Sequence, residues 1–129
     1  MKLRVIFKDN CIENKYHLFF VEFMKFLQNY LPLKKDLDVI FFEEREGKMT
    51  TGSRHSNSII YVLSGKRLNR DILRTIAHEW THEYQMTILN REKGPDIGGL
   101  NEDEANAIAG RLVKMFEKKY PQFISIVYE

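Results

Sequence analysis

The spacing of apolar residues at the start of the chain predicts a strand followed by a helix. Lys2–Phe7 reads as a short strand. Between residues 12 and 30, apolar side chains recur at helical spacing, in a stripe wide enough to indicate a largely buried helix. The stripe consists of Ile12, Tyr16, Phe19, Phe20, Phe23, Phe26, Leu27 and Tyr30. Pro32 follows and marks the end of this helix, and His17 inside it is interpreted as a structural residue.

A group of strands is predicted next. Residues 37–44 are rich in strand-forming side chains, and Gly47 marks a turn after them. Met49–Arg54 is a candidate short edge strand. Residues 58–65 contain a continuous apolar run, which indicates a buried strand.

The following polar and apolar pattern predicts a second helix. Asn69 suits the N-cap position of a helix that runs to about residue 91. Glycine and proline then predict a loop over residues 92–99.

A third helix is predicted after this loop. Asn101 and Glu104 have the spacing of a capping sequence, so the helix is expected to start with Asn101 as N-cap and to end near Lys119. Residues 122–129 suit either a final strand or a docking tail. The order of elements predicts one α+β domain over residues 1–129, with a small sheet packed on helices.

Composition narrows the class of protein. A chain of 129 residues with 43% hydrophobic content can fill one core, and a net charge of +2 favours neither nucleic acid nor anionic lipid. Glu22 and Lys25 interrupt the longest apolar segment, which excludes a membrane span. The N-terminal apolar run is too short for a signal peptide, and Cys11 is the sole cysteine. We therefore expect a soluble cytoplasmic protein, in which Cys11 is a packed or idle thiol.

The candidate chemistry lies in "RTIAHEWTHEYQM", residues 74–86, where His78, Glu79 and His82 fit H-E-x-x-H. Residues four apart share one helix face, so two imidazoles can be aimed at one metal ion. A helical wheel places both histidines nearly opposite the apolar sector, facing water or a cleft. That sector consists of Ile72, Ile76, Ala77, Trp80, Tyr84 and Thr87.

Two imidazoles suit zinc, and catalytic zinc usually takes a third protein ligand while one position is left for water. Zinc lowers the pKa of that water to about 7, and Glu79, beside the metal, could then accept its proton. The alternative is a solvated helix face with two ordinary histidines.

These residues resemble the gluzincins, in which a glutamate on a following helix is the third ligand, often in E-x-x-[A/S]-[D/N]. Residues 102–106, with the sequence EDEAN, fit that pattern. On the wheel Glu102 lies near the edge of the apolar stripe of its helix, whereas Glu104 lies well off it. Glu102 is therefore the preferred ligand and Glu104 the reserve. Asn106 is a candidate for orienting a histidine through its second ring nitrogen.

Within the gluzincins, "TIAHEWTHEYQ" followed by "EDEANAIAGRLV" is similar to the ImmA/IrrE-type metallopeptidases, over roughly residues 70–116. The resemblance implies one zinc ion bound by His78, His82 and Glu102, with Glu79 as general base and acid. It also implies a zincin-like fold, in which the histidine helix packs beneath a small twisted, mostly antiparallel-edged sheet. The edge strand could hold an extended peptide.

The expected activity is hydrolysis of peptide bonds in a protein or peptide substrate. For the oxyanion of the reaction, His55, Tyr84 and Arg111 are candidates by type, and His55 is the best of them because Tyr84 falls in the apolar sector. The alternative is a non-catalytic zincin-fold module that binds proteins. A structural zinc site fits poorly, because such sites normally have four protein ligands and are often rich in cysteine.

Overall fold

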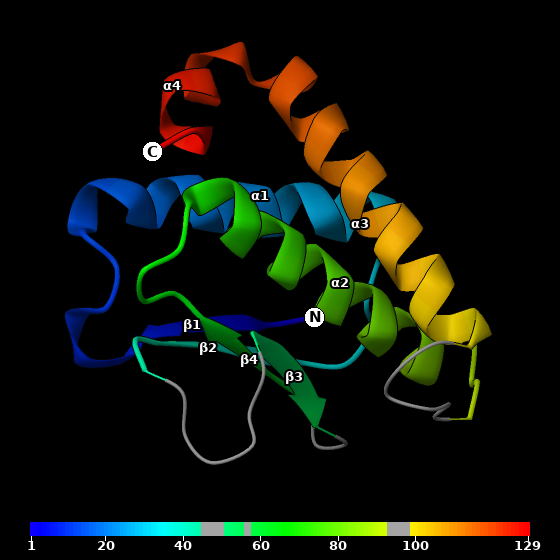
Figure 1. The fold of residues 1–129 in the computed structure, drawn as a ribbon. Helices are drawn as coiled ribbons and strands as arrows, with labels where there is room; N and C mark the ends of the chain where they lie inside the picture. Colours follow the sequence, from blue (N-terminus) through cyan, green and yellow to red (C-terminus); the bar gives the residue numbers. More distant parts are fainter. Residues whose placement is uncertain (45–50, 56–57, 93–98) are drawn as a thin grey trace.

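A computed structural model describes residues 1–44, 51–55, 58–92 and 99–129, and their strands and helices follow the predicted order (Figure 1). Short 3-10 turns lie at Lys8–Asn10, Asn14–Tyr16 and Pro121–Phe123. The strands and α-helices are β1 (Leu3–Phe7), α1 (His17–Tyr30), β2 (Leu37–Phe42), β3 (Gly52–His55), β4 (Ile59–Leu63), α2 (Asn69–Thr87), α3 (Leu100–Lys119) and α4 (Ile124–Val127). The α+β class is confirmed. Within the described ranges, no helix is both long enough and apolar enough to cross a membrane.

The four strands form one mixed sheet in the order β1-β2-β4-β3. β1 pairs with β2 and β2 with β4 in parallel, whereas β3 pairs with β4 in antiparallel orientation. The sheet is thus antiparallel only at the edge formed by β3, whereas the edge formed by β1 is parallel. The expectation of mostly antiparallel edges is wrong for the β1 edge. The reason is the crossover through α1, which returns the chain so that β2 runs in the same direction as β1.

The helices lie on one side of the sheet in two layers, with α1 and α2 against the strands and α3 and α4 outside them (Figure 1). Phe20 of α1 contacts Phe41 of β2, with ring centroids 5.5 Å apart. On its other side, α1 packs edge-on against Phe116 of α3, through Phe23 at 5.0 Å. The apolar stripe of α1 is therefore buried between the sheet and α3, as its width predicts.

Element boundaries differ from the predictions by a few residues. α1 begins at His17 rather than residue 12, because the ring of His17 stacks on Phe7 at 3.8 Å and its Nε2 bonds the carbonyl oxygen of Ile12 at 2.9 Å. These contacts confirm a structural role for His17. β2 ends at Phe42 rather than residue 44, and α2 ends at Thr87 rather than near residue 91.

Two further strand predictions concern the edge of the sheet. Of the predicted edge strand Met49–Arg54, residues 52–54 lie in β3, while Met49 and Thr50 are outside the described residues, as is the predicted turn at Gly47. The buried strand predicted over residues 58–65 is confirmed as β4.

The predicted cap at Asn69 is wrong. Leu68 is the N-cap of α2, and the Asn69 side chain donates a hydrogen bond to the carbonyl oxygen of Ile126 at 3.0 Å. The chain after α3 is a 3-10 turn and α4 rather than a strand, and Val127 is fully buried. Asn69 thus helps to dock the C-terminal segment onto α2. Of the two predictions for residues 122–129, a final strand or a docking tail, the second is confirmed.

The predicted capping sequence at Asn101 and Glu104 is also wrong. α3 starts two residues earlier than expected, at Leu100, with Gly99 as N-cap at φ 84° and ψ 167°. This backbone conformation is essentially restricted to glycine. Because the helix begins there, Asn101 and Glu104 lie inside it, and their side chains bond residues in the last turn of α2 and in the segment after it.

Candidate metal centre

The two motif histidines lie where α2 passes between β3 and α3. One helical turn separates them, and their Nε2 atoms are 3.0 Å apart. The side chain of His78 is 17% exposed and that of His82 is 15% exposed. The structure therefore shows both histidines largely buried between neighbouring elements rather than on a face open to water.

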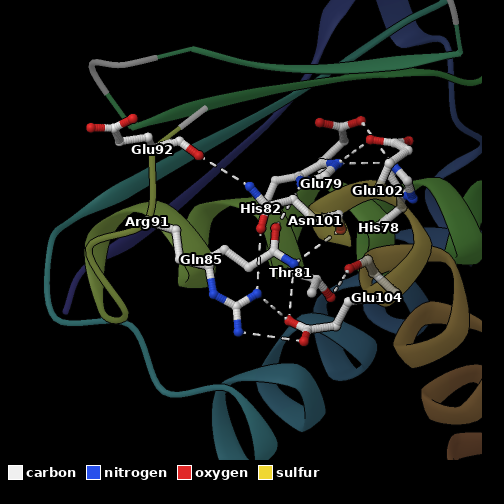
Figure 2. Close-up of polar contacts among 11 residues, drawn as sticks. His78, Glu79, Thr81, His82, Gln85, Arg91, Glu92, Asn101, Glu102 and Glu104 are labelled. Carbon is white, nitrogen blue, oxygen red and sulfur yellow. Dashed lines mark hydrogen bonds and ion pairs between the residues drawn. The ribbon is translucent and has the colours of Figure 1, made fainter. Parts of the chain in front are cut away.

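Glu102 of α3 faces both histidines across the gap between the helices (Figure 2). One carboxylate oxygen lies 2.8 Å from Nε2 of His78, and the other lies 2.9 Å from Nε2 of His82. The ligand atoms of these three residues all lie within 4.8 Å of one another, close enough for one metal ion. The reserve candidate, Glu104, instead forms an ion pair with Arg91 at 2.7 Å.

The chemistry of this donor set fits a divalent metal of the zinc type. Two imidazole nitrogens and one carboxylate oxygen form a common three-ligand set of catalytic zinc sites. Burial lowers the pKa of His78, although Glu102 opposes this effect, and the neutral imidazole is the form that binds metals. A hydrogen bond with the Asn106 side chain also raises the pKa of His78, so the predicted contact of Asn106 with a histidine is present.

Glu79 lies beside this cluster rather than in it. Its Oε1 atom is 4.0 Å from Nε2 of His78, and the residue is only 8% exposed. Burial raises the pKa of Glu79 to about 7, against the opposing effects of His82 and Arg54. A carboxyl group with this pKa can accept and return a proton near neutral pH.

The edge strand β3 is fixed to α2 next to Glu79 by a buried ion pair. Nε of Arg54 lies 2.6 Å from Oε2 of Glu83, whose other oxygen accepts a hydrogen bond from Ser58 at 3.0 Å. Glu83 is 1% exposed, so this pair is shielded from solvent. The sequence predictions missed both partners. The available signal was that Glu83 follows Glu79 by four residues and so shares its helix face.

Gly52 permits the close approach of β3 to α2. A Cβ atom at this position would lie 2.5 Å from Cγ2 of Thr75 and 3.1 Å from Cγ of Glu79. The absence of a side chain therefore allows the Glu79 side chain to lie directly against the strand.

We predict that Gly52→Ala destabilises the metal-free protein by roughly 1–3 kcal/mol, because the added methyl group overpacks this contact. The matched control is Gly110→Ala on α3, where a Cβ meets nothing within 4 Å. That change should stabilise α3 by roughly 0.5–1 kcal/mol. Urea unfolding of both variants measures these effects, and equal stability of Gly52→Ala and the wild type would contradict the prediction.

Two of the three candidates for an oxyanion-stabilising group, Tyr84 and Arg111, lie away from the site. Tyr84 packs partly buried against the hydrophobic core, as predicted. Arg111 is exposed and lies nine residues beyond Glu102, about 13 Å along the axis of α3. The backbone of His55 pairs with Ile59 in the sheet, but its side chain is outside the described part of the structure. Burial raises the pKa of the free Cys11 thiol, which agrees with a packed rather than a nucleophilic cysteine.

Sequence reasoning also missed Gln85, which is fully buried beside the candidate metal centre. Its side-chain oxygen lies 2.9 Å from Nδ1 of His82, and its amide nitrogen bonds Glu104 at 3.0 Å. The available signal was helical spacing, since Gln85 follows His78 by seven residues and His82 by three.

Known proteins give no further indication of what the site does. Comparison of the chain with protein-family models, with curated proteins and with solved structures gives no match. Its function is therefore inferred from the residues of the site themselves.

Proposed function

We propose that this protein is a zinc-dependent metallopeptidase of the gluzincin type, similar to the ImmA/IrrE-type metallopeptidases, in a zincin-like fold. One observation carries the proposal: the nitrogen and oxygen ligand atoms of His78, His82 and Glu102 converge, and the buried carboxyl group of Glu79 lies beside them. The substrate class is a protein or peptide.

The ligand set supports a catalytic rather than a structural metal site. Among the residues that the structure describes, three side chains converge and none of them is a cysteine, whereas structural zinc is normally enclosed by four protein ligands. When bound there, zinc would supply Lewis acidity, which polarises a carbonyl group and lowers the pKa of a water molecule to about 7.

The residues around the ligands supply the proton chemistry. Glu79 lies beside the ligands, where it would take a proton from an attacking water and pass it to the leaving amine. In the metal-free chain burial raises the pKa of this carboxyl group to about 7. The low exposure of Glu79 keeps bulk water away from this exchange.

The neighbouring strand supplies a surface for the substrate. β3 is the last strand in the sheet order and runs alongside α2, where the Arg54–Glu83 ion pair fixes it. An extended peptide backbone can pair with such a sheet edge, which would lay its scissile bond near Glu79.

The test is the zinc content of the purified chain after dialysis against metal-free buffer, followed by incubation with a peptide library. We expect about one zinc per chain and zinc-dependent cleavage. A chain that takes up no zinc, even when the metal is offered back, would refute the proposal. Bound zinc without any cleavage would favour the alternative of a non-catalytic, protein-binding module.

A further inference from the structure

Gln85 joins the metal centre to a polar cluster between the end of α2 and the start of α3 (Figure 2). Its amide oxygen lies 2.9 Å from Nδ1 of His82. Its amide nitrogen donates hydrogen bonds to Oε1 of Glu104 at 3.0 Å and to the backbone oxygen of Asn101 at 3.1 Å. No part of Gln85 reaches solvent, so these bonds are not exchanged for bonds to water.

The partners fix which way the amide of Gln85 points. The Glu104 carboxylate and the Asn101 carbonyl can only accept hydrogen bonds, so the NH2 group must face them. The amide oxygen therefore faces His82, and it also can only accept. A hydrogen bond at this contact requires that Nδ1 of His82 carries a hydrogen.

This assignment determines the state of the other ring nitrogen. A neutral imidazole carries one hydrogen, so with Nδ1 protonated the Nε2 atom of His82 presents a lone pair. That atom lies 2.9 Å from Oε2 of Glu102 and 3.0 Å from Nε2 of His78. A lone pair facing a carboxylate oxygen at this distance is favourable only with a cation or a proton between them.

The cluster that holds Gln85 also ties the two helices together. Arg91 bonds both oxygens of Glu104, at 2.7 and 3.4 Å, and its backbone nitrogen donates to the backbone oxygen of Gln85 at 3.0 Å. Asn101 in turn donates to the backbone oxygen of Glu92 at 3.1 Å. Glu104 is thus an anchor for Gln85, two residues away from Glu102 on α3.

We infer that Gln85 is a positioning residue of the metal centre, which holds the hydrogen on Nδ1 of His82 and leaves Nε2 to bind the metal. Through Glu104 it also fixes the first turns of α3, so that Glu102 meets the histidines. The role in metal binding rests on the proposed function, whereas the state of the His82 ring is independent of it.

Three variants test this inference. Gln85→Met removes the acceptor at nearly constant side-chain length. The double variant Gln85→Glu/Glu104→Gln exchanges the two groups at unchanged net charge. It restores an acceptor at His82 and a donor at position 104, but the backbone oxygen of Asn101 loses its donor. Gln28→Met is the matched control, because Gln28 makes a similar pair of bonds with the backbone of Leu33, at 3.0 Å each, away from the site.

The first readout is the ¹⁵N NMR pattern of the His82 ring in metal-free protein at pH 8, where the two neutral forms of an imidazole are distinguished. The second is the Kd for zinc. In the wild type we expect the form with a hydrogen on Nδ1, whether Nε2 is bare or shares a proton with Glu102. Gln85→Met should lose this form and weaken zinc binding by about 10–100-fold, the usual effect of losing a ligand-orienting group. The double variant should recover the hydrogen on Nδ1 and part of the zinc affinity, because the Asn101 carbonyl and Arg91 lose their partners. Gln28→Met should change neither property.

The outcomes separate this inference from the proposed function. A His82 ring without hydrogen on Nδ1 in the wild type would overturn the inference, whether or not zinc binds. The expected Nδ1–H form and its loss in Gln85→Met, in a chain that never binds zinc, would support the orienting role and refute the proposed function. If Gln85→Met does not fold, the wild type and the double variant still decide the ring state.

Discussion

Replacing Glu79 by glutamine is expected to lower kcat/KM for peptide hydrolysis by about 10²–10⁴-fold, the range attributed to general acid–base groups. Glutamine keeps the shape of the side chain but cannot accept the proton. Zinc binding should remain, because Glu79 lies beside the three ligands and is not one of them. The measurement is kcat/KM on a cleaved peptide together with zinc content. Unchanged hydrolysis would contradict the assignment of the base.

The same substitution should also change how the stability of the protein depends on pH. The unfolding curves used to measure this change also show whether the variant is folded under the assay conditions. Burial raises the pKa of Glu79 from 4.5 to about 7. Between these pH values the folded chain holds a proton that the unfolded chain releases, so stability falls as pH rises. Glu79→Gln removes this group. Between pH 4.5 and 8 the free energy of unfolding should therefore fall by roughly 1–3 kcal/mol less in the metal-free variant than in the metal-free wild type. Urea unfolding across this pH range measures the difference.

Replacing Glu102 by alanine is expected to raise the Kd for zinc more than 100-fold. Its two carboxylate oxygens face the two histidines at 2.8 and 2.9 Å, so the variant loses a direct ligand. Loss of an outer orienting partner costs only about 10–100-fold. Glu104→Ala should fall in that smaller range, because Glu104 acts through Gln85. The measurement is zinc affinity by competition with a chelator.

Glu117 provides the matched control on the same helix. It forms an ion pair with Arg70 at 3.0 Å, and its side chain is 17% exposed, close to the 21% of Glu102. Glu117→Ala should leave zinc affinity unchanged. At a free zinc concentration of 100 times the wild-type Kd, bound metal stabilises a protein by about 2.7 kcal/mol. This gain should nearly vanish in Glu102→Ala, fall to about 0.4–1.4 kcal/mol in Glu104→Ala and remain in Glu117→Ala. A larger loss of affinity in Glu104→Ala would reverse the choice of ligand.

The sequence by itself determined the features that depend on helical and strand periodicity. The spacing of four residues put His78 and His82 on one face of α2, whatever surrounded that face. The apolar stripe of α3 decided which acid would turn toward α2, and the structure does bring Glu102 and not Glu104 to the histidines. These predictions succeeded because backbone geometry and burial of apolar side chains act within one element.

Only the tertiary structure decided how the polar side chains are used. Asn69 and Asn101 have the residue type of helix caps, but Asn69 docks the C-terminal segment and Asn101 bonds Arg91 and Glu92 in the segment after α2. The close approach at Gly52 and the bond from Gln85 to His82 join elements whose relative positions no local pattern fixes. The physical reason is that a polar group bonds whichever partner packing brings within about 3 Å, and that partner can lie anywhere in the sequence.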